Sequence, residues 1–336
     1  MKIVKQNHEI ITDDNPMKHI EKIARVCYKS EDKICDGSDK RMIATLFKNG
    51  HMAMLEHFRF IMQVNKTIYE CIEQINPEYF EYTYDTTSHR YLVSCNARAL
   101  INMKPKLGGE ISEQMCKFVK DELIGHIVKE YGCYELFNIE DGNQPPILST
   151  PVNFIENKRT CMTGYEFTKH GWMSCKFTTD RGMTHELVRH RKASFAQEST
   201  RYCNYAKDKF GEEITVVKPP FMSADRLDKK IVSKLEKEWE KGIKESEKAY
   251  FMLLRLGAKP QEARGVLPTS VKADIVVTTN VEEWLHIFEL RSLGTTGKPH
   301  PMMKELMGKL LEEIVFDWYI KGNKDGLNIG GDWLYE

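Results

Sequence analysis

The 336-residue sequence lacks a long apolar run and an excess of charge of either sign. No segment approaches the roughly 20 apolar residues that a membrane-spanning helix needs, and the first residues do not show the apolar stretch behind a basic flank that is typical of a secretory signal. Lys plus Arg and Asp plus Glu both number 49, whereas general binding to nucleic acid depends on a strong excess of cations. We therefore expect a protein that binds neither membranes nor nucleic acid.

The sequence also lacks paired cysteines and nucleotide-binding loops. Its nine cysteines contain no CxxC pair, which fits a reducing compartment better than a disulfide framework or a zinc ribbon. Neither a GxGxxG nor a Walker loop is present, so a Rossmann or P-loop site is not expected. In HELVRH, His185 and His190 are five positions apart, whereas the HExxH zinc motif needs a spacing of four. We therefore expect a cytoplasmic protein without a metal site, in which a cysteine such as Cys203 is a packed residue.

Strand and helix patterns mix along the whole chain, which indicates an α/β or α+β fold without a dividing linker. Apolar side chains recur every four residues from Leu227 to Ile243, as in a long amphipathic helix, and Gly257 and Pro260 follow as a stop signal. The patterns predict strands over residues 57–64, 90–100, 213–217 and 274–279 and from Met173, helices from His19, Asp39 and Asn280 and over residues 184–191, and a polar loop over 141–151.

The run RHRKASFAQESTR, from Arg189 to Arg201, gathers four strong cations and a His in a chain of zero net charge. One interpretation is a helix with an ion pair from Glu186 to the next turn and cations near its end, where the macrodipole favours them. The other is that the cations converge on a phosphate group, which Arg binds through paired charge-assisted hydrogen bonds. Composition alone leaves both interpretations open.

RHR followed by Ser after seven residues, continuing as RHRKASFAQESTRY, resembles the signature of the flavin-dependent thymidylate synthases. Three other segments resemble elements of that family and occur in its order: LEHFRF around His57, EARGVLP with Arg264, and NVEEWLHIFELR from Asn280 to Arg291. The resemblance covers roughly residues 15–64 and 173–315. We predict that residues 65–172 are an insertion, atypical of the family, within a single catalytic domain of residues 1–336. RYLVSCNAR in that insertion resembles an element of some longer members.

The resemblance implies a mixed or antiparallel sheet flanked by helices, with the long insertion added. It implies reductive methylation of dUMP to dTMP, with methylenetetrahydrofolate as the carbon donor and NADPH as the reductant through FAD. Members of the family are typically homotetramers whose active sites are assembled from several subunits, so the same is expected here.

The resemblance also assigns residues to the nucleotide. Arg291 would lie against the uracil ring, where a cation stabilises the negative charge that develops there. The resemblance makes Arg291 and Ser199 the catalytic candidates, and the residues expected to bind dUMP are Glu186, Arg189, Ser199, Arg201, Arg264 and Arg291. The residues expected to bind FAD are His57, Arg189, His190, Arg191, Gln197, Asn280, Glu282 and His286.

Some of these residues have simpler interpretations. Asn280 is also a good helix N-cap, His286 could be a satisfied core residue, and Ser199 could hydrogen-bond locally. Many members of the family have Gln at the position of Glu186, and a carboxylate near phosphate needs a compensating cation. Many have Glu at the position of Gln197 and Asn at that of His286, so Glu198 is an alternative to Gln197.

The sequence after Arg291, SLGTTGKPHPMMKEL, also differs from the common pattern at the expected folate contacts. Two alternative functions remain: a flavoprotein that keeps the nucleotide site but acts on another substrate, and a nucleic-acid-binding module that uses RHRK.

Overall fold

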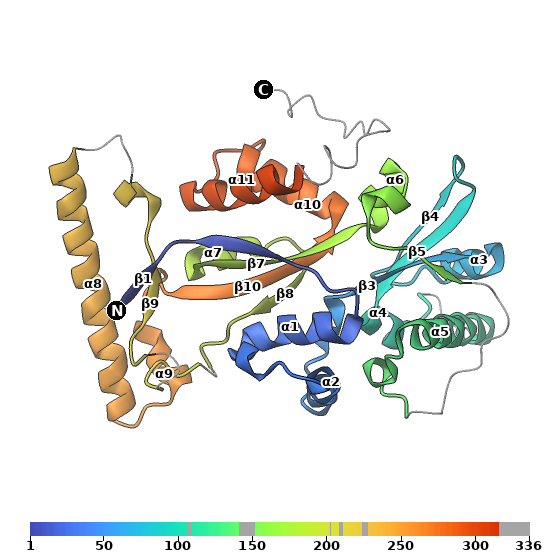
Figure 1. The fold of residues 1–336 in the computed structure, drawn as a ribbon, viewed down its shortest axis with the longest axis horizontal. Helices are drawn as coiled ribbons and strands as arrows, with labels where there is room; N and C mark the ends of the chain where they lie inside the picture. The colour runs from blue at the N-terminus through green and yellow to red at the C-terminus, as the bar shows by residue number, and fades with distance from the viewer. Residues whose placement is uncertain (107–108, 141–151, 202, 208–210, 224–227, 316–336) are drawn as a thin grey trace.

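A computed structural model describes residues 1–106, 109–140, 152–201, 203–207, 211–223 and 228–315. Within these residues, two four-stranded antiparallel sheets and a two-stranded parallel pair are surrounded by helices (Figure 1). The expected class, mixed α/β with antiparallel sheets and flanking helices, is therefore confirmed. Among the described residues, no helix is long and apolar enough to cross a membrane.

The first sheet has the strand order β2-β7-β10-β8. Its two long central strands pair antiparallel along their whole length, and β10 is buried at every position after its first. A buried strand of this kind requires cover on both faces: α10 and α11 pack on one face, and α1 packs on the other (Figure 1). The elements are β2 (Asn7–Ile11), β7 (Trp172–Asp180), β8 (Ser194–Gln197), β10 (Lys272–Asn280), α1 (Pro16–Tyr28), α7 (Arg181–Leu187), α10 (Val281–Phe288) and α11 (Pro301–Val315).

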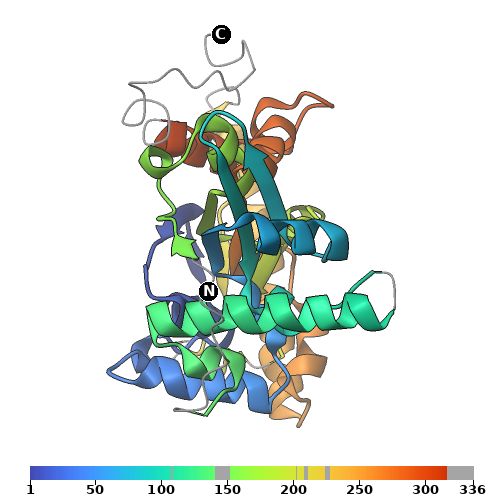
Figure 2. The same cartoon turned by 90° about the vertical axis from the view of Figure 1, so that its right-hand side faces the viewer.

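The second sheet, of strand order β4-β5-β3-β6, takes three of its four strands from the expected insertion. Figure 2 views the molecule from the side of α3 and α5. The largest apolar core joins this sheet and its helices to α1, α2 and the start of β7, so residues 65–172 share a core with the rest of the chain. The elements are β3 (Arg59–Val64), β4 (Glu81–Asp85), β5 (Arg90–Asn96), β6 (Asn153–Phe154), α2 (Ser38–Lys48), α3 (Lys66–Ile75), α4 (Ala97–Ile101), α5 (Glu110–Tyr131) and α6 (Gly164–His170).

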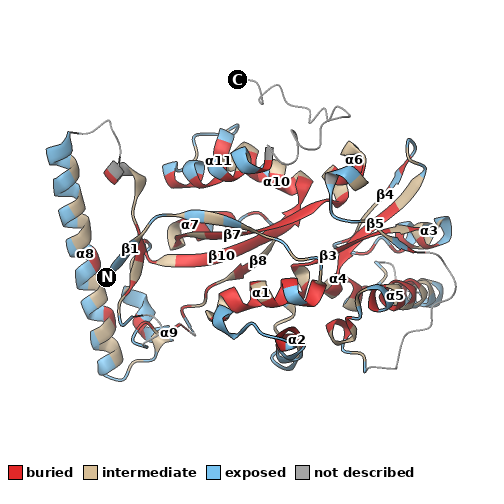
Figure 3. Ribbon diagram, in the orientation of Figure 1, coloured by how far each residue is buried: buried red, intermediate tan, exposed pale blue. Residues whose placement is uncertain are grey.

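The amphipathic helix predicted after Leu227 is α8 (Lys229–Arg255); Leu227 itself lies outside the described residues. Its apolar stripe is covered only in part (Figure 3). Ile243 and Tyr250 are buried, whereas Ile231 and Leu235 are 49% and 38% exposed. β9 (Thr215–Val217), which pairs parallel with β1 (Lys2–Val4), and the short α9 (Pro260–Ala263) contribute to the same small core.

The predicted elements within the described residues are confirmed with two corrections. The helix expected over residues 184–191 was wrong beyond Leu187, where α7 ends. Residues 188–193 instead form the turn that returns the chain to β8. The cations of RHRK therefore lie on this turn and not on the helix. The strand expected over residues 90–100 stops at Asn96, whose side chain caps the short α4. The loop predicted over residues 141–151 lies outside the described residues.

Candidate functional site

Two strand-to-helix junctions position the site. Asp180, at the end of β7, caps α7 by accepting a hydrogen bond from the Met183 amide at 2.8 Å. Asn280, at the end of β10, caps α10 by accepting one from the Glu283 amide at 3.0 Å. Such caps satisfy amides that a helix start leaves unpaired. The simpler interpretation of Asn280 as a cap is therefore correct, and a role toward FAD stays a prediction.

Arg291 is held at three points by α7 and the turn that follows it. A π-helical turn, Glu289–Leu293, continues α10 and carries Arg291. Its Nη1 donates to the Glu186 carboxylate, its Nη2 to the Glu186 carbonyl and its Nε to His190 Nε2, each at 3.1 Å. Glu186 thus has the compensating cation that a carboxylate at this position needs, and its partner is Arg291, not a residue of the next helical turn.

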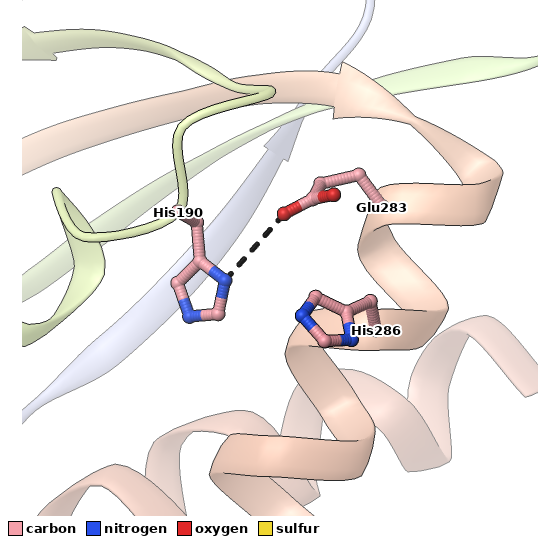
Figure 4. A group of neighbouring side chains, drawn as sticks. All are labelled: His190, Glu283 and His286. Carbon is pink, nitrogen blue, oxygen red and sulfur yellow. Dashed lines mark ion pairs between the residues drawn. The ribbon is translucent and has the colours of Figure 1, made fainter.

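His190 is a buried, neutral imidazole, 5% exposed. Burial, Arg291 and His286 lower the pKa of His190 from 6.5 to about 4. Because Nε2 accepts the hydrogen bond from Arg291, the ring proton lies on Nδ1, which faces Glu283 Oε1 at 3.5 Å (Figure 4). Burial also raises the pKa of Glu283. The half-exposed His286 lies beside the pair, so the simpler interpretation of His286 as a core residue is wrong.

The donor atoms of His190, Glu283 and His286 lie within 4.8 Å of one another (Figure 4). Two imidazoles and a carboxylate are a donor set that suits a transition metal such as Zn²⁺. The guanidinium of Arg291, hydrogen-bonded to the same imidazole, would repel a divalent cation there.

A cavity of about 760 Å³ lies between the two sheets, and we call it the inter-sheet cavity. One wall comes from the end of β10 with Asn280 and from the loop with Arg191. The opposite wall comes from β3, β4 and β5 with the segment after α4. Its volume lies within the range of cavities that bind small molecules and cofactors. Its lining carries three carboxylates and six cationic side chains, which are Arg59, Arg98, Lys104, Lys106, Arg191 and Lys192.

Sequence reasoning missed several lining residues of this cavity. Arg59 lies two positions after His57 in the LEHFRF segment, and Arg98 lies in RYLVSCNAR, the element of longer members. Glu56 joins the two walls, since it pairs with Arg98 and accepts a hydrogen bond from Ser194 Oγ at 2.8 Å. The signal in the sequence was the resemblance of LEHFRF and RYLVSCNAR to family elements. The sequence did not indicate that the two segments line the same cavity.

His57 lies behind the wall of the cavity. It is completely buried, and its Nδ1 shares a 2.7 Å hydrogen bond with Thr278 Oγ1, a lining residue. Burial and the neighbouring His19 lower the pKa of His57 to about 3, so the ring is neutral. In this structure His57 supports the lining and does not contribute to it, and its predicted contact with FAD stays a prediction.

The residues expected around the dUMP phosphate lie on the segment after β8 and beside α9. Ser199 Oγ accepts a hydrogen bond from the Arg201 amide at 3.3 Å, which is the local bond of its simpler interpretation. Arg264 donates to Thr200 Oγ1 at 3.1 Å, so EARGVLP reaches the QESTR segment. Arg189, Arg201 and Arg264 are exposed.

Gln197 and Glu198 point to opposite faces of the sheet, as successive strand residues do. Gln197 donates to Thr184 Oγ1 of α7 at 2.9 Å, on the side of Glu186. Glu198 is 2% exposed and pairs with Lys29 and Lys272 on the other side. Gln197 therefore lies nearer the candidate site and Glu198 belongs to a buried ion-pair cluster.

Two other expectations concern single residues. Glu282, expected at FAD, forms an ion pair with Lys169 of α6. Cys203 is 1% exposed, as expected of a packed cysteine.

Comparisons with known proteins support the family resemblance. The model of the family described as thymidylate synthase complementing protein matches residues 9–136 and 164–315. The match thus includes residues 65–136 of the expected insertion and leaves 137–163 unmatched. The flavin-dependent thymidylate synthase of Pyrococcus abyssi is 37% identical over 134 residues, which are 40% of this chain and 50% of that protein. That of Pyrococcus horikoshii is 38% identical over 134 residues, with the same coverage.

The chain thus spans about half the length of the curated relatives that it matches. A solved structure of a UMP/dUMP methylase, PolB from Streptomyces cacaoi, is 12% identical with a TM-score of 0.41, and the match covers 94% of this chain and 92% of that one.

Proposed function

We propose that this chain, which belongs to the thymidylate synthase complementing protein family, is a flavin-dependent thymidylate synthase that methylates dUMP to dTMP. Methylenetetrahydrofolate would supply the carbon, and NADPH would supply the reducing equivalents through FAD. The observation that carries the proposal is the three-point hold on Arg291 by Glu186 and His190. Residues 105 positions apart in the chain meet there, and both lie within residues 173–315, which the resemblance covers.

Arg291 is suited to stabilise a developing anion. Its side chain is 20% exposed, so it is accessible yet fixed by its partners. His190 is neutral, so it orients the guanidinium without adding a second positive charge. A donor that is fixed in advance costs no reorganisation when negative charge develops on the uracil ring, and its removal typically lowers the rate by about 10²–10³.

The inter-sheet cavity suits FAD in size and charge. Arg191 and Asn280, both expected at the flavin, lie on one wall, and Arg59 and Arg98 lie on the other. Arginines bind phosphate groups through paired donors, so these residues would hold the dinucleotide. When bound, FAD would supply hydride transfer, which no side chain can supply.

The dUMP phosphate would be held by Ser199, Arg201 and Arg264, with Arg189 nearby. The three arginines are exposed in a single chain, as expected for sites that are completed by a neighbouring subunit. We propose a homotetramer with shared sites on this ground and on the resemblance. The half-covered stripe of α8 is a candidate contact between subunits.

The test is to incubate the purified protein with FAD, NADPH, methylenetetrahydrofolate and dUMP and to quantify dTMP by chromatography. We expect dTMP only when all four are present. Arg291→Ala should lower the rate by about 10²–10³. Arg41→Ala, a change of an exposed arginine on α2, is the matched control and should leave the rate unchanged. Bound FAD and dUMP without dTMP would reject the reaction in favour of a flavoprotein with another substrate.

A further inference from the structure

The wall of the inter-sheet cavity formed by the second sheet carries a cation, Arg59, that makes no direct ion pair among the described residues. Arg59 on β3 lies opposite Asn96 on β5 in the strand register, so both side chains are on the cavity face. Arg59 donates to Ser94 Oγ at 3.3 Å. Among the described residues, its buried Nε has no hydrogen-bond partner and its guanidinium makes no ion pair. Burial lowers the pKa of Arg59, whereas the nearby carboxylate of Glu81 raises it without forming an ion pair. An arginine remains charged in proteins. Arg59 is half-buried and its Nε has no hydrogen-bond partner among the described residues, so an anion that binds there would be stabilising.

A second arginine on the same wall is held by a single carboxylate. Arg98 pairs through Nη1 with Glu56, and the Arg98 side chain is 39% exposed. Glu56 also accepts the hydrogen bond from Ser194 on the opposite wall, so its charge is shared between the walls. The lining as a whole has six cationic side chains and three carboxylates. An excess of positive charge in a partly enclosed cavity attracts anions, and Arg98 can exchange one anionic partner for another.

Building on the proposed function, we propose that Arg59 and Arg98 form a phosphate subsite on this wall, in which a phosphate group of the bound ligand takes the place of Glu56 at Arg98. Residues 65–172 thereby supply part of the cofactor cavity. Two phosphate sources fit the same chemistry, namely the diphosphate of FAD and the 2′-phosphate of NADPH. The guanidinium fork binds phosphate with two parallel hydrogen bonds, as it does carboxylate, so the exchange keeps its geometry.

The test compares Arg98→Gln with Glu56→Gln, two changes that break the same ion pair from opposite sides. Affinities for FAD and for riboflavin, which has no phosphate, are measured by flavin fluorescence. If the FAD diphosphate is the ligand, Arg98→Gln should weaken FAD binding roughly ten- to hundredfold, the loss of one charge-assisted hydrogen-bonded contact, and leave riboflavin unaffected. Glu56→Gln frees Arg98, so FAD should bind at least as tightly as in the wild type.

A second arm separates the two sources. The rate of flavin reduction is measured with NADPH and with NADH, which lacks the 2′-phosphate. If the 2′-phosphate is the ligand, Arg98→Gln should raise the KM for NADPH and leave both that for NADH and FAD binding unchanged. Equal weakening of FAD and riboflavin by both variants, or no effect of Arg98→Gln in either arm, would overturn the subsite and give the ion pair a purely structural role.

Inorganic pyrophosphate makes the inference testable apart from the proposed function. It should raise the melting temperature of the wild type more than that of Arg98→Gln, whether or not flavin binds. A wild type that binds no flavin but shows this difference would reject the proposed function and keep the subsite. The wild type could instead make dTMP while pyrophosphate raises the melting temperatures of wild type and Arg98→Gln equally and the variant binds its ligands with unchanged affinity. That result would keep the proposed function and reject the subsite.

Discussion

Replacing Arg291 by Gln should raise the pKa of His190 from about 4 part of the way back toward its ordinary 6.5. If His190 were protonated beside Arg291, two cations would lie 3.1 Å apart between Nε2 and Nε. Their repulsion is about 5 kcal/mol at an effective dielectric constant of about 20. At roughly 1.4 kcal/mol per pKa unit, this repulsion exceeds the energy that corresponds to the whole lowering of the His190 pKa. It is therefore an upper limit. Water around Arg291, which is 20% exposed, screens part of it.

The return should be partial, because burial of the ring is the largest cause of the lowered pKa and persists in the variant. The assay is an NMR titration of ring-labelled histidine, with the His190 signal identified by its loss in His190→Asn. Arg291→Lys, which keeps the charge but loses the guanidinium fork, should leave the His190 pKa closer to the wild-type value than Arg291→Gln does. If His190 titrates at the same pH in Arg291→Gln and in the wild type, the guanidinium does not set its charge and the argument fails.

Three other predictions concern stability and assembly. Stability to urea should fall as pH decreases from about 6.5 to about 4. In the folded chain four buried histidines have pKa values of about 3 to 4, so in this pH range they bind fewer protons than in the unfolded chain. A urea midpoint that does not change with pH in this range would contradict this. The histidines are His19, His57, His170 and His190. Glu198→Ala should cost about 2 kcal/mol in unfolding free energy, since Lys29 and Lys272 lose one buried carboxylate and share only Asp274. Gln197→Ala should cost about 1 kcal/mol, and equal losses would refute the assignment of Glu198 to the ion-pair cluster. Ile231→Glu with Leu235→Glu should lower the mass measured by light scattering if the exposed stripe of α8 joins subunits, and an unchanged mass would exclude this contact.

Local patterns predicted the two central strands of the first sheet, β7 and β10, because these strands are largely buried and have strong β-propensity. The edge strands β2 and β8 are less buried and were not predicted. The run DIVVTT became β10, and Asn280 caps α10 as the sequence indicated. The error at residues 188–191 has a physical cause. THELVRHR has the composition of a continuing helix, but the chain must turn after Leu187 to place β8 beside β10. A tertiary requirement of this kind leaves no trace in helix periodicity.

The motifs predicted which segments carry the site, but not how the charges pair. Glu186 was expected either to pair within its helix or to contact nucleotide, and its partner Arg291 is 105 positions away. The choice between Gln197 and Glu198 was open because both are polar and adjacent. Only the strand register decides it, by turning Gln197 toward α7 and Glu198 toward Lys272.

The cavity could not be predicted because one of its walls lies in the segment that the resemblance did not cover. The antiparallel pairing of β3 with β5 sets Arg59 opposite Asn96, and this pairing joins LEHFRF to RYLVSCNAR across some thirty residues of intervening chain. Arg59 alone reads as an exposed strand cation, and Arg98 alone as a helix residue. Their common face exists only after the sheet forms. The segment that seemed an addition to the fold therefore contributes much of the charge of the cavity, and an account of cofactor binding that omits it would leave the buried Nε of Arg59 without a partner.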